Sequence, residues 1–382
     1  GLRCEYRDTP LGVDTPSPRF NWQLDTGMQT AYRIFVASSQ DLLKEGKADL
    51  WDSGRIESDQ SVHVEYAGAP LASDTPYYWQ VQVWSAAETA SNASTFTTGL
   101  YDPAAWKGAK WIQAPDSKTM PLFRKSFTLD TTPARATMYI CGLGQYELRI
   151  NGQKTGQDLM VPSWTNYRKT CLYNAYDVTQ QLRSGENALG VLLGNGMYNV
   201  PGGRYVKFTG SFGQPKLIGV LRLHYTDGTE SAIVSDTTWK TTDGPITFSC
   251  IYGGEDYDAR REQDGWDAPG FDDVWWNAAI ECDGPGGTLR AQAAPPVREM
   301  EAFVPKAVTE PKPGVFLYDF GQNASGMPRL TVKGEAGATI RMTPAEKLTK
   351  DGLADQGSVG SPSYFEYTTR SDAEEAWQPR FT

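Results

Sequence analysis

Histidine is almost absent from this chain. Only His63 and His224 occur in 382 residues, and each lies in a short alternating run that predicts a strand. Two histidines in separate strands therefore argue against a catalytic triad or a zinc site built on histidine.

Cysteine is also scarce, and its spacing excludes the common metal and redox motifs. The sequence has no CxxC pair and an odd number of cysteines, namely Cys4, Cys141, Cys171, Cys250 and Cys282. This pattern predicts mostly free, buried thiols, with a single bridge such as Cys250 to Cys282 as the alternative.

Long apolar runs and clusters of positive charge are missing as well. The formal net charge is −10, and no run of Lys or Arg forms a basic patch, so nucleic acid is not an expected partner. No stretch approaches the ~18 apolar residues of a membrane span. The first residues show no signal-peptide pattern. The sequence does not determine the cellular compartment, and a periplasmic or extracellular location is favoured over a cytoplasmic one.

The residues that are abundant indicate β-structure. The chain has 38 Gly, 24 Pro, 12 Trp and 19 Tyr, and it lacks long amphipathic helical stretches. Such a composition at this length predicts an all-β protein of two or three domains, arranged as tandem β-sandwiches.

The domain divisions follow from turn-rich junctions. Residues 1–104 predict a fibronectin type III-like sandwich, because residues 75–84 alternate as its strand F does and offer Tyr77 or Tyr78 as a tyrosine-corner residue. Residues 105–295 predict a second sandwich, which ends at a proline-rich linker. Residues 296–382 predict the start of a further, truncated sandwich with an unpaired edge near residues 364–382.

The stretch from Cys141 to Tyr198 predicts antiparallel strands that display their loops. Asn151-Gly152 suits a two-residue primed turn. The loops that follow carry aromatic rings and side-chain amides, which suit the C–H face and the hydroxyls of a neutral sugar. The candidate sugar-binding residues are Trp164, Asn166, Asn195 and Tyr198. The competing interpretation is structural, with Trp164 closing the end of the core and Asn166 completing a turn.

Residues 251–265 form the densest charged stretch. If they are extended, Glu255 and Tyr257 lie on one face and Asp256 and Asp258 on the other. One interpretation is a carboxylate pair that acts as acid and base on a glycoside. The favoured interpretation is a structural charged network of Glu255, Asp256, Asp258, Arg260 and Arg261, because nearby arginines keep carboxylates ionised.

Collinear motifs along the whole chain resemble bacterial α-L-rhamnosidases of glycoside hydrolase family 78. They are LGVDTPSPRFNW (11–22), QTAYRIFVASS (29–39), LWDSGRI (50–56), TPYYWQVQVW (75–84), LFRKSFTL (122–129), GLGQYELRINGQKTG (142–156), YDVTQQLRSGEN (176–187), IYGGEDYDARRE (251–262), YDFGQNASG (318–326) and EEAWQPRFT (374–382).

The resemblance implies N-terminal β-sandwiches followed by an (α/α)₆ barrel that carries the catalytic glutamates. It implies inverting hydrolysis of terminal α-L-rhamnosyl linkages by two carboxylates roughly 6.5 to 9.5 Å apart. Neither carboxylate maps onto this sequence, so no catalytic residue is assigned. The expected partners are a rhamnose-containing glycan or glycoside and the missing catalytic barrel of the same polypeptide.

The second domain is similar to the family's jelly-roll, which in some members resembles a calcium-assisted rhamnose-binding module. By this resemblance, the loop that contains Trp164 and Asn166 would bind the rhamnose. Asn166 stands where the family often has an acidic residue, and a neutral amide is a weaker Ca²⁺ ligand. No cofactor is expected to be required. The alternatives are an autonomous rhamnose-binding protein without catalysis and a small glycosidase that uses Glu255 or Asp258.

Overall fold

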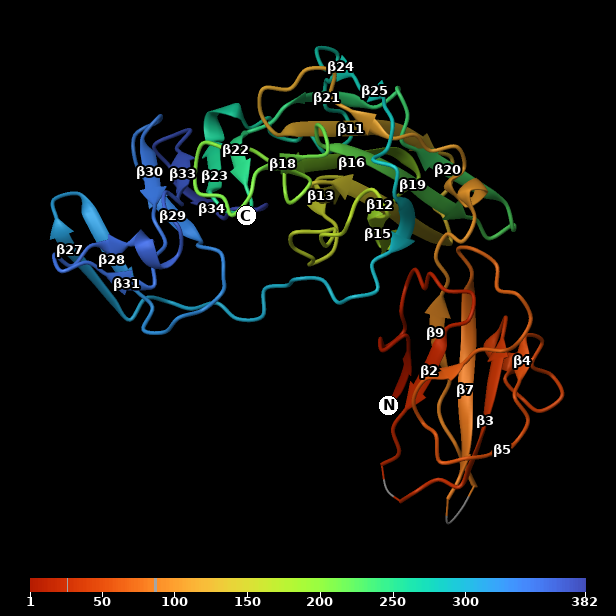
Figure 1. Cartoon of the computed structure of the whole chain (residues 1–382). Coiled ribbons are helices and arrows are strands. Elements are labelled where there is room, and N and C mark those ends of the chain that lie inside the picture. The colour runs from red at the N-terminus through yellow and green to blue at the C-terminus, as the bar shows by residue number, and fades with distance from the viewer. Residues whose placement is uncertain (26, 86–87) are drawn as a thin grey trace.

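The protein is almost entirely β-structure. The computed structural model describes residues 1–25, 27–85 and 88–382. In this described part of the chain, helix is limited to short 3₁₀ turns: η1 (Gln40–Leu42), η2 (Pro103–Trp106), η3 (Thr179–Gln181), η4 (Ala259–Arg261) and η5 (Gln356–Ser358). The predicted all-β class is confirmed. In Figure 1 the first domain projects as an arm from the central sandwich, and the C-terminal segment lies at the opposite end.

The first domain is a sandwich of two antiparallel sheets. The smaller sheet joins β1 (Leu2–Cys4), β2 (Arg19–Trp22) and β6 (Val64–Glu65). The larger sheet joins β4 (Trp51–Asp52), β3 (Ala31–Ala37), β7 (Pro76–Trp84) and β8 (Glu88–Ala90), with β5 (Ile56–Glu57) on β3 and β9 (Ser94–Thr97) on β7.

The aromatic side chains of β7 form the core of this domain. Trp79 is fully buried and packs on Phe20, with ring centroids 4.4 Å apart. Tyr77 is buried too, and its hydroxyl accepts the backbone N–H of Ala72 at 2.9 Å. A hydrogen bond to the backbone a few residues upstream is the tyrosine-corner arrangement, so Tyr77 rather than Tyr78 has that role.

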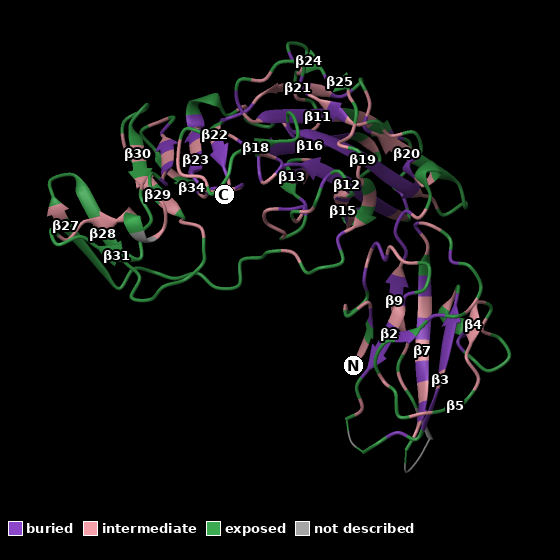
Figure 2. Ribbon diagram, in the orientation of Figure 1, coloured by how far each residue is buried: buried purple, intermediate pink, exposed green. Residues whose placement is uncertain are grey.

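The second domain is a larger sandwich. One sheet runs β25 (Ile280–Glu281), β10 (Ile112–Gln113), β19 (Lys216–His224), β12 (Arg135–Leu143), β15 (Thr170–Asp177) and β26 (Thr288–Ala291), with β20 (Glu230–Val234) on β19. The other runs β14 (Gln153–Lys154), β13 (Gln145–Ile150), β16 (Gly185–Gly194), β11 (Pro121–Leu129), β21 (Lys240–Asp243) and β24 (Asn277–Ala278). Figure 2 shows that the buried residues concentrate in these central strands.

The hairpin between β13 and β14 has the predicted turn. Asn151 and Gly152 have φ values of 51° and 83°, as a type I′ turn requires. The Asn151 side chain donates to the backbone oxygen of Gln181 at 2.7 Å, which ties this turn to η3. Apolar side chains of both sheets, among them Leu148, Val191 and Leu221, fill the space between them.

Two strands of the C-terminal segment join a sheet with strands of the second domain. A four-stranded sheet runs β22 (Ile246–Cys250), β23 (Gly254–Asp258), β33 (Phe365–Thr368) and β30 (Thr339–Met342). The parallel pairing of β23 with β33 thus crosses the boundary expected at residue 295. The expectation of an unpaired edge near residues 364–382 is wrong for β33, which has partners on both sides and buries Phe365 and Tyr367.

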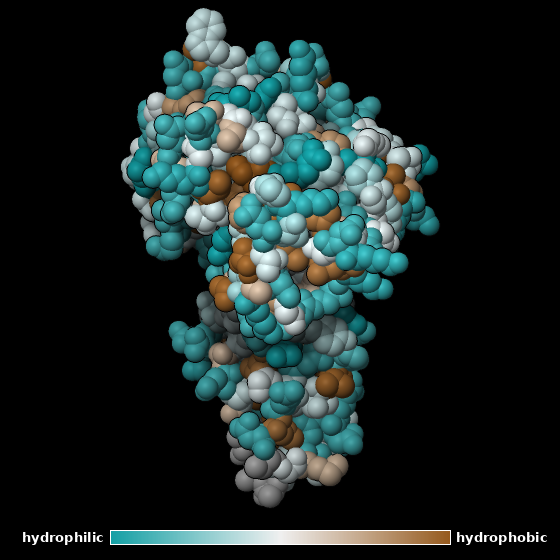
Figure 3. Space-filling model, turned by 90° about the vertical axis from the view of Figure 1, so that its left-hand side faces the viewer, coloured by the Kyte–Doolittle hydropathy of each residue, from teal (hydrophilic) through white to brown (hydrophobic). Residues whose placement is uncertain are grey.

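Strands with a single partner occur elsewhere in this segment, and one of them, β34, lies within residues 364–382. The remaining strands pair only two by two: β27 (Ala307–Lys312) with β28 (Val315–Asp319), β29 (Leu330–Lys333) with β34 (Glu374–Trp377), and β31 (Lys347–Leu348) with β32 (Ala354–Asp355). Val308 and Tyr318 are opposite each other, and both are more than half exposed, as is Phe316. Figure 3 faces this end of the molecule and shows hydrophobic side chains at its surface.

Candidate functional site

Two loops of the second domain form a depression of ≈ 700 Å³. One loop precedes β15 and contributes Trp164, Thr165, Asn166 and Arg168. The other follows β16, includes the small ribbon of β17 (Asn199–Val200) and β18 (Gly210–Ser211), and contributes Met197, Phe208, Gly210, Ser211 and Phe212. The loops meet because they leave the same end of the sandwich.

Aromatic rings form the apolar part of this depression. The Trp164 side chain is 62% exposed, and its ring lies 6.3 Å from that of Phe208 with an angle of 30° between the planes. Phe212 adds a third partly exposed ring. Such a surface suits the C–H face of a pyranose, and a Trp that closed the core would be buried instead.

Two of the four predicted sugar-binding residues lie beneath this surface. Asn195 and Tyr198 are buried, so the structure does not bring them together with Trp164 and Asn166 at the depression. The Asn195 amide donates to the Ser249 backbone oxygen at 2.8 Å, and the Tyr198 hydroxyl donates to the Phe212 backbone oxygen at 3.1 Å. Both side chains therefore fix the loop that carries Phe212.

Arg168, Phe208 and Phe212 are among the residues at the depression that were not predicted from the sequence. Phe208 and Phe212 are 44 and 48 positions beyond Trp164 in the sequence, so local pattern alone does not connect them to it. A usable signal was the absence of acidic residues. No Asp or Glu occurs between Asp158 and Asp177, or between Glu186 and Asp227.

These residues do not fit a calcium ion. The Asn166 side-chain oxygen already accepts the backbone N–H of Arg168 at 3.2 Å. The two loops carry no carboxylate, and Ca²⁺ requires six to eight oxygen ligands, several of them usually carboxylates. The Arg168 guanidinium also lines the depression, and its positive charge opposes a cation.

Glu255 in the acid-rich stretch is completely buried. It lies on β23, and its oxygens accept the backbone N–H groups of Arg380 and Phe381 at 3.0 to 3.2 Å. Burial raises the pKa of this carboxyl to about 7, while the Arg380 charge and these hydrogen bonds oppose that increase. Glu255 thus holds the residues after β34 against the second domain.

The two aspartates of the same strand face the opposite side, as alternation predicts. Arg260 donates two hydrogen bonds to Asp258 at 2.8 and 2.9 Å, Arg261 lies 3.6 Å away, and the Arg260 bonds keep the Asp258 pKa below its ordinary value. Asp256 instead pairs with Arg204 at 2.5 Å. Burial raises the pKa of Asp256 despite that partner.

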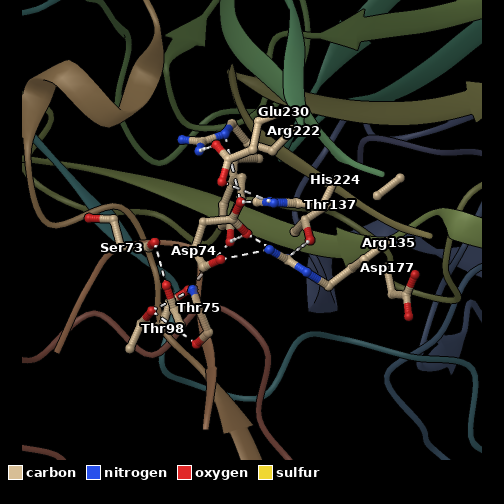
Figure 4. Close-up of polar contacts among 12 residues, drawn as sticks. Ser73, Asp74, Thr75, Thr98, Arg135, Thr137, Asp177, Arg222, His224 and Glu230 are labelled. Carbon is tan, nitrogen blue, oxygen red and sulfur yellow. Dashed lines mark hydrogen bonds and ion pairs between the residues drawn. The ribbon is translucent and has the colours of Figure 1, made fainter. Parts of the chain in front are cut away.

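Asp74 forms a second buried charge cluster, between the first and second domains (Figure 4). Its side chain is fully buried and accepts hydrogen bonds from Arg135 at 2.7 Å, Tyr139 at 2.8 Å and His224 at 2.6 Å. Burial alone would raise the Asp74 pKa, but the bonds from His224 and Arg135 bring it below its ordinary value. The sequence alone did not single out this cluster.

Comparison with protein families matches almost the whole chain in three parts. Residues 1–102 match the Rha78A-like, N-terminal immunoglobulin domain. Residues 131–301 match the alpha-L-rhamnosidase N-terminal domain, and residues 309–382 match the bacterial alpha-L-rhamnosidase concanavalin-like domain.

Individual relatives agree with these matches. An α-L-rhamnosidase of Formosa agariphila is 35% identical over 98% of this chain and 44% of its own length. The structure of α-L-rhamnosidase from Dictyoglumus thermophilum superposes with a TM-score of 0.91 and 37% identity, covering 100% of this chain and 45% of that one. The Streptomyces avermitilis α-L-rhamnosidase complexed with L-rhamnose gives a TM-score of 0.91 at 28% identity, covering 100% and 54%.

The chain thus spans about half the length of these relatives. Its three matched parts occur in one order along the sequence, and all carry rhamnosidase descriptions. The chain belongs to the α-L-rhamnosidases of glycoside hydrolase family 78 and corresponds to their N-terminal β-sandwich portion.

Proposed function

We propose that this chain is the accessory, sugar-presenting part of an α-L-rhamnosidase and that Trp164 and Asn166 contact rhamnosyl glycans. The observation that supports it best is the depression beside Trp164, where exposed rings border free hydrogen-bond donors. The Streptomyces avermitilis relative, complexed with L-rhamnose, supports the choice of sugar.

We place the catalytic carboxylates outside residues 1–382. Glu255 is fully buried and its oxygens are occupied by backbone N–H groups, so it has no access to a glycosidic oxygen. Asp258 is held by arginines that keep it ionised, which makes it a poor general acid. An inverting pair on a following barrel, as the family resemblance implies, would supply acid and base instead.

Replacement of Trp164 by Ala tests the sugar site. We expect rhamnose binding to be lost, because the variant removes the largest exposed ring of the depression while leaving buried packing intact. Calorimetric titration with L-rhamnose measures this, with thermal unfolding as the check on folding. Trp275→Ala is the matched control, since Trp275 is 90% exposed elsewhere. An affinity unchanged by Trp164→Ala would reject the assignment.

The partner of the C-terminal segment is, in this proposal, the rest of the rhamnosidase polypeptide. A two-stranded ribbon such as β27–β28 is marginally stable alone, and its Val308, Phe316 and Tyr318 face is exposed. This exposed face favours an accessory part over an autonomous binding protein, because an autonomous protein would leave the apolar face in contact with water.

Dye binding tests this surface. We expect the 382-residue chain to increase the fluorescence of an apolar-surface dye such as ANS, and Phe316→Ser with Tyr318→Ser to reduce that signal without lowering the Tm. Met28→Ser is the control, because Met28 is exposed in the first domain. A dimer in sedimentation that the double variant dissociates would instead assign the surface to a second copy.

A further inference from the structure

The side-chain nitrogen groups at the depression are hydrogen-bond donors that remain free for a ligand. The Thr165 hydroxyl donates to the Thr170 backbone oxygen at 2.6 Å, and the Ser211 hydroxyl donates to that of Gly213 at 3.3 Å. The Asn166 oxygen is already used by the Arg168 backbone. The donors that remain for a ligand are the Asn166 amide N–H₂ and the Arg168 guanidinium, which has five N–H donors and no acceptor.

The charge around these donors is positive, although the whole chain is acidic. Arg168 lies 5.8 Å from the Phe212 ring centroid, and no ion pair among the described residues involves it. Lys169 and Lys207 are exposed in the same two loops, which contain no carboxylate. In a protein with ten more acidic than basic residues, two loops with three exposed cations and no carboxylate are a local exception, and Arg168 is the cation that lines the depression.

From these two observations we propose that the depression binds an acidic sugar, with Arg168 and Asn166 holding the carboxylate of a uronate residue in a rhamnose-containing glycan. Arg pairs with carboxylates through two parallel hydrogen bonds, which are stronger than neutral ones. A uronate keeps the pyranose face that stacks on Trp164. This inference rests on the proposed sugar-binding function and adds the class of glycan.

The test uses two disaccharides that differ in one group. The first has L-rhamnose linked to a uronic acid, and the second has the same linkage with the carboxylate reduced to a primary alcohol. Both are titrated calorimetrically into the 382-residue chain at low salt. We expect the acidic disaccharide to bind about tenfold more tightly, and that advantage to shrink in about 1 M salt, where the Debye length is only about 3 Å.

Variants locate the effect at Arg168. Arg168→Gln retains donors without the charge and should lower the affinity for the acidic disaccharide to that of the neutral one. Lys350→Gln, at another exposed cation, should change neither affinity. Equal affinities for the two disaccharides would overturn the uronate inference and leave the sugar-binding function standing. Binding of neither disaccharide nor L-rhamnose would overturn both.

Discussion

Replacing Asp74 by Asn should destabilise the protein by about 3 to 5 kcal/mol, the range for breaking a buried ion pair by removing one partner. Asp74 is fully buried and lies within 4 Å of three positively charged or protonatable side chains, those of Arg135, Arg222 and His224. Without its negative charge, Arg135 loses its ion pair, and Arg222 and His224 keep, among the described residues, only the half-exposed Glu230 as a carboxylate partner. Asn is the informative replacement because Asp74 has a φ of 51°, which Asn tolerates better than Ala.

Urea unfolding followed by fluorescence measures this loss, and small-angle X-ray scattering reports whether the first domain leaves its position. Glu230→Gln is the matched control. Glu230 pairs with Arg222 at 2.9 Å in the same cluster but is 47% exposed, so its replacement should cost less than about 1 kcal/mol. Equal, small effects of the two variants would show that the Asp74 cluster does not hold the domains together.

Glu255 should make the protein lose stability as the pH rises from about 4.5 to about 7. A carboxyl whose pKa is higher in the folded than in the unfolded chain binds its proton more tightly when folded. The protonated Glu255 therefore contributes its full stability below about pH 4.5, and that contribution is lost as the pH rises through about 7. At 1.36 kcal/mol per pKa unit, the loss is about 3 kcal/mol.

Glu255→Gln isolates this contribution, because the amide keeps an oxygen for the backbone N–H groups of Arg380 and Phe381 but does not titrate. Its free energy of unfolding should vary less than that of the original chain between pH 4.5 and 8. Glu346→Gln, at an exposed position, should follow the original chain. If Glu255→Gln and the original chain keep parallel pH profiles, Glu255 is ionised throughout this range.

Local chemistry predicted much of the fold. Asn151-Gly152 and the alternation of residues 75–84 each determine a turn or a strand within a few residues, and both predictions agree with the structure. The boundary at residue 295 depended on composition alone. It missed the parallel pairing of β23 with β33, which joins Asp256 to Glu366 across more than a hundred residues.

At the candidate site, too, local sequence did not determine which residues are buried or which lie together. Trp164 and Asn166 were selected from the sequence for their aromatic and amide side chains, and both are exposed in the structure. Asn195 and Tyr198 also carry an amide and an aromatic ring, but both are buried. Burial depends on the neighbouring strands and cannot be predicted from the residue type. Arg168 and Phe208 are brought together only by the two loops meeting.

In the proposed function, this chain binds rhamnosyl sugars and leaves the hydrolysis to another part of the enzyme. Calorimetric titration of the 382-residue chain with L-rhamnose, beside an assay with an aryl α-L-rhamnoside, tests it most directly. We expect binding without turnover, with or without Ca²⁺. Turnover that Glu255→Gln or Asp258→Asn abolishes would contradict it, because the acid-rich stretch would then be catalytic.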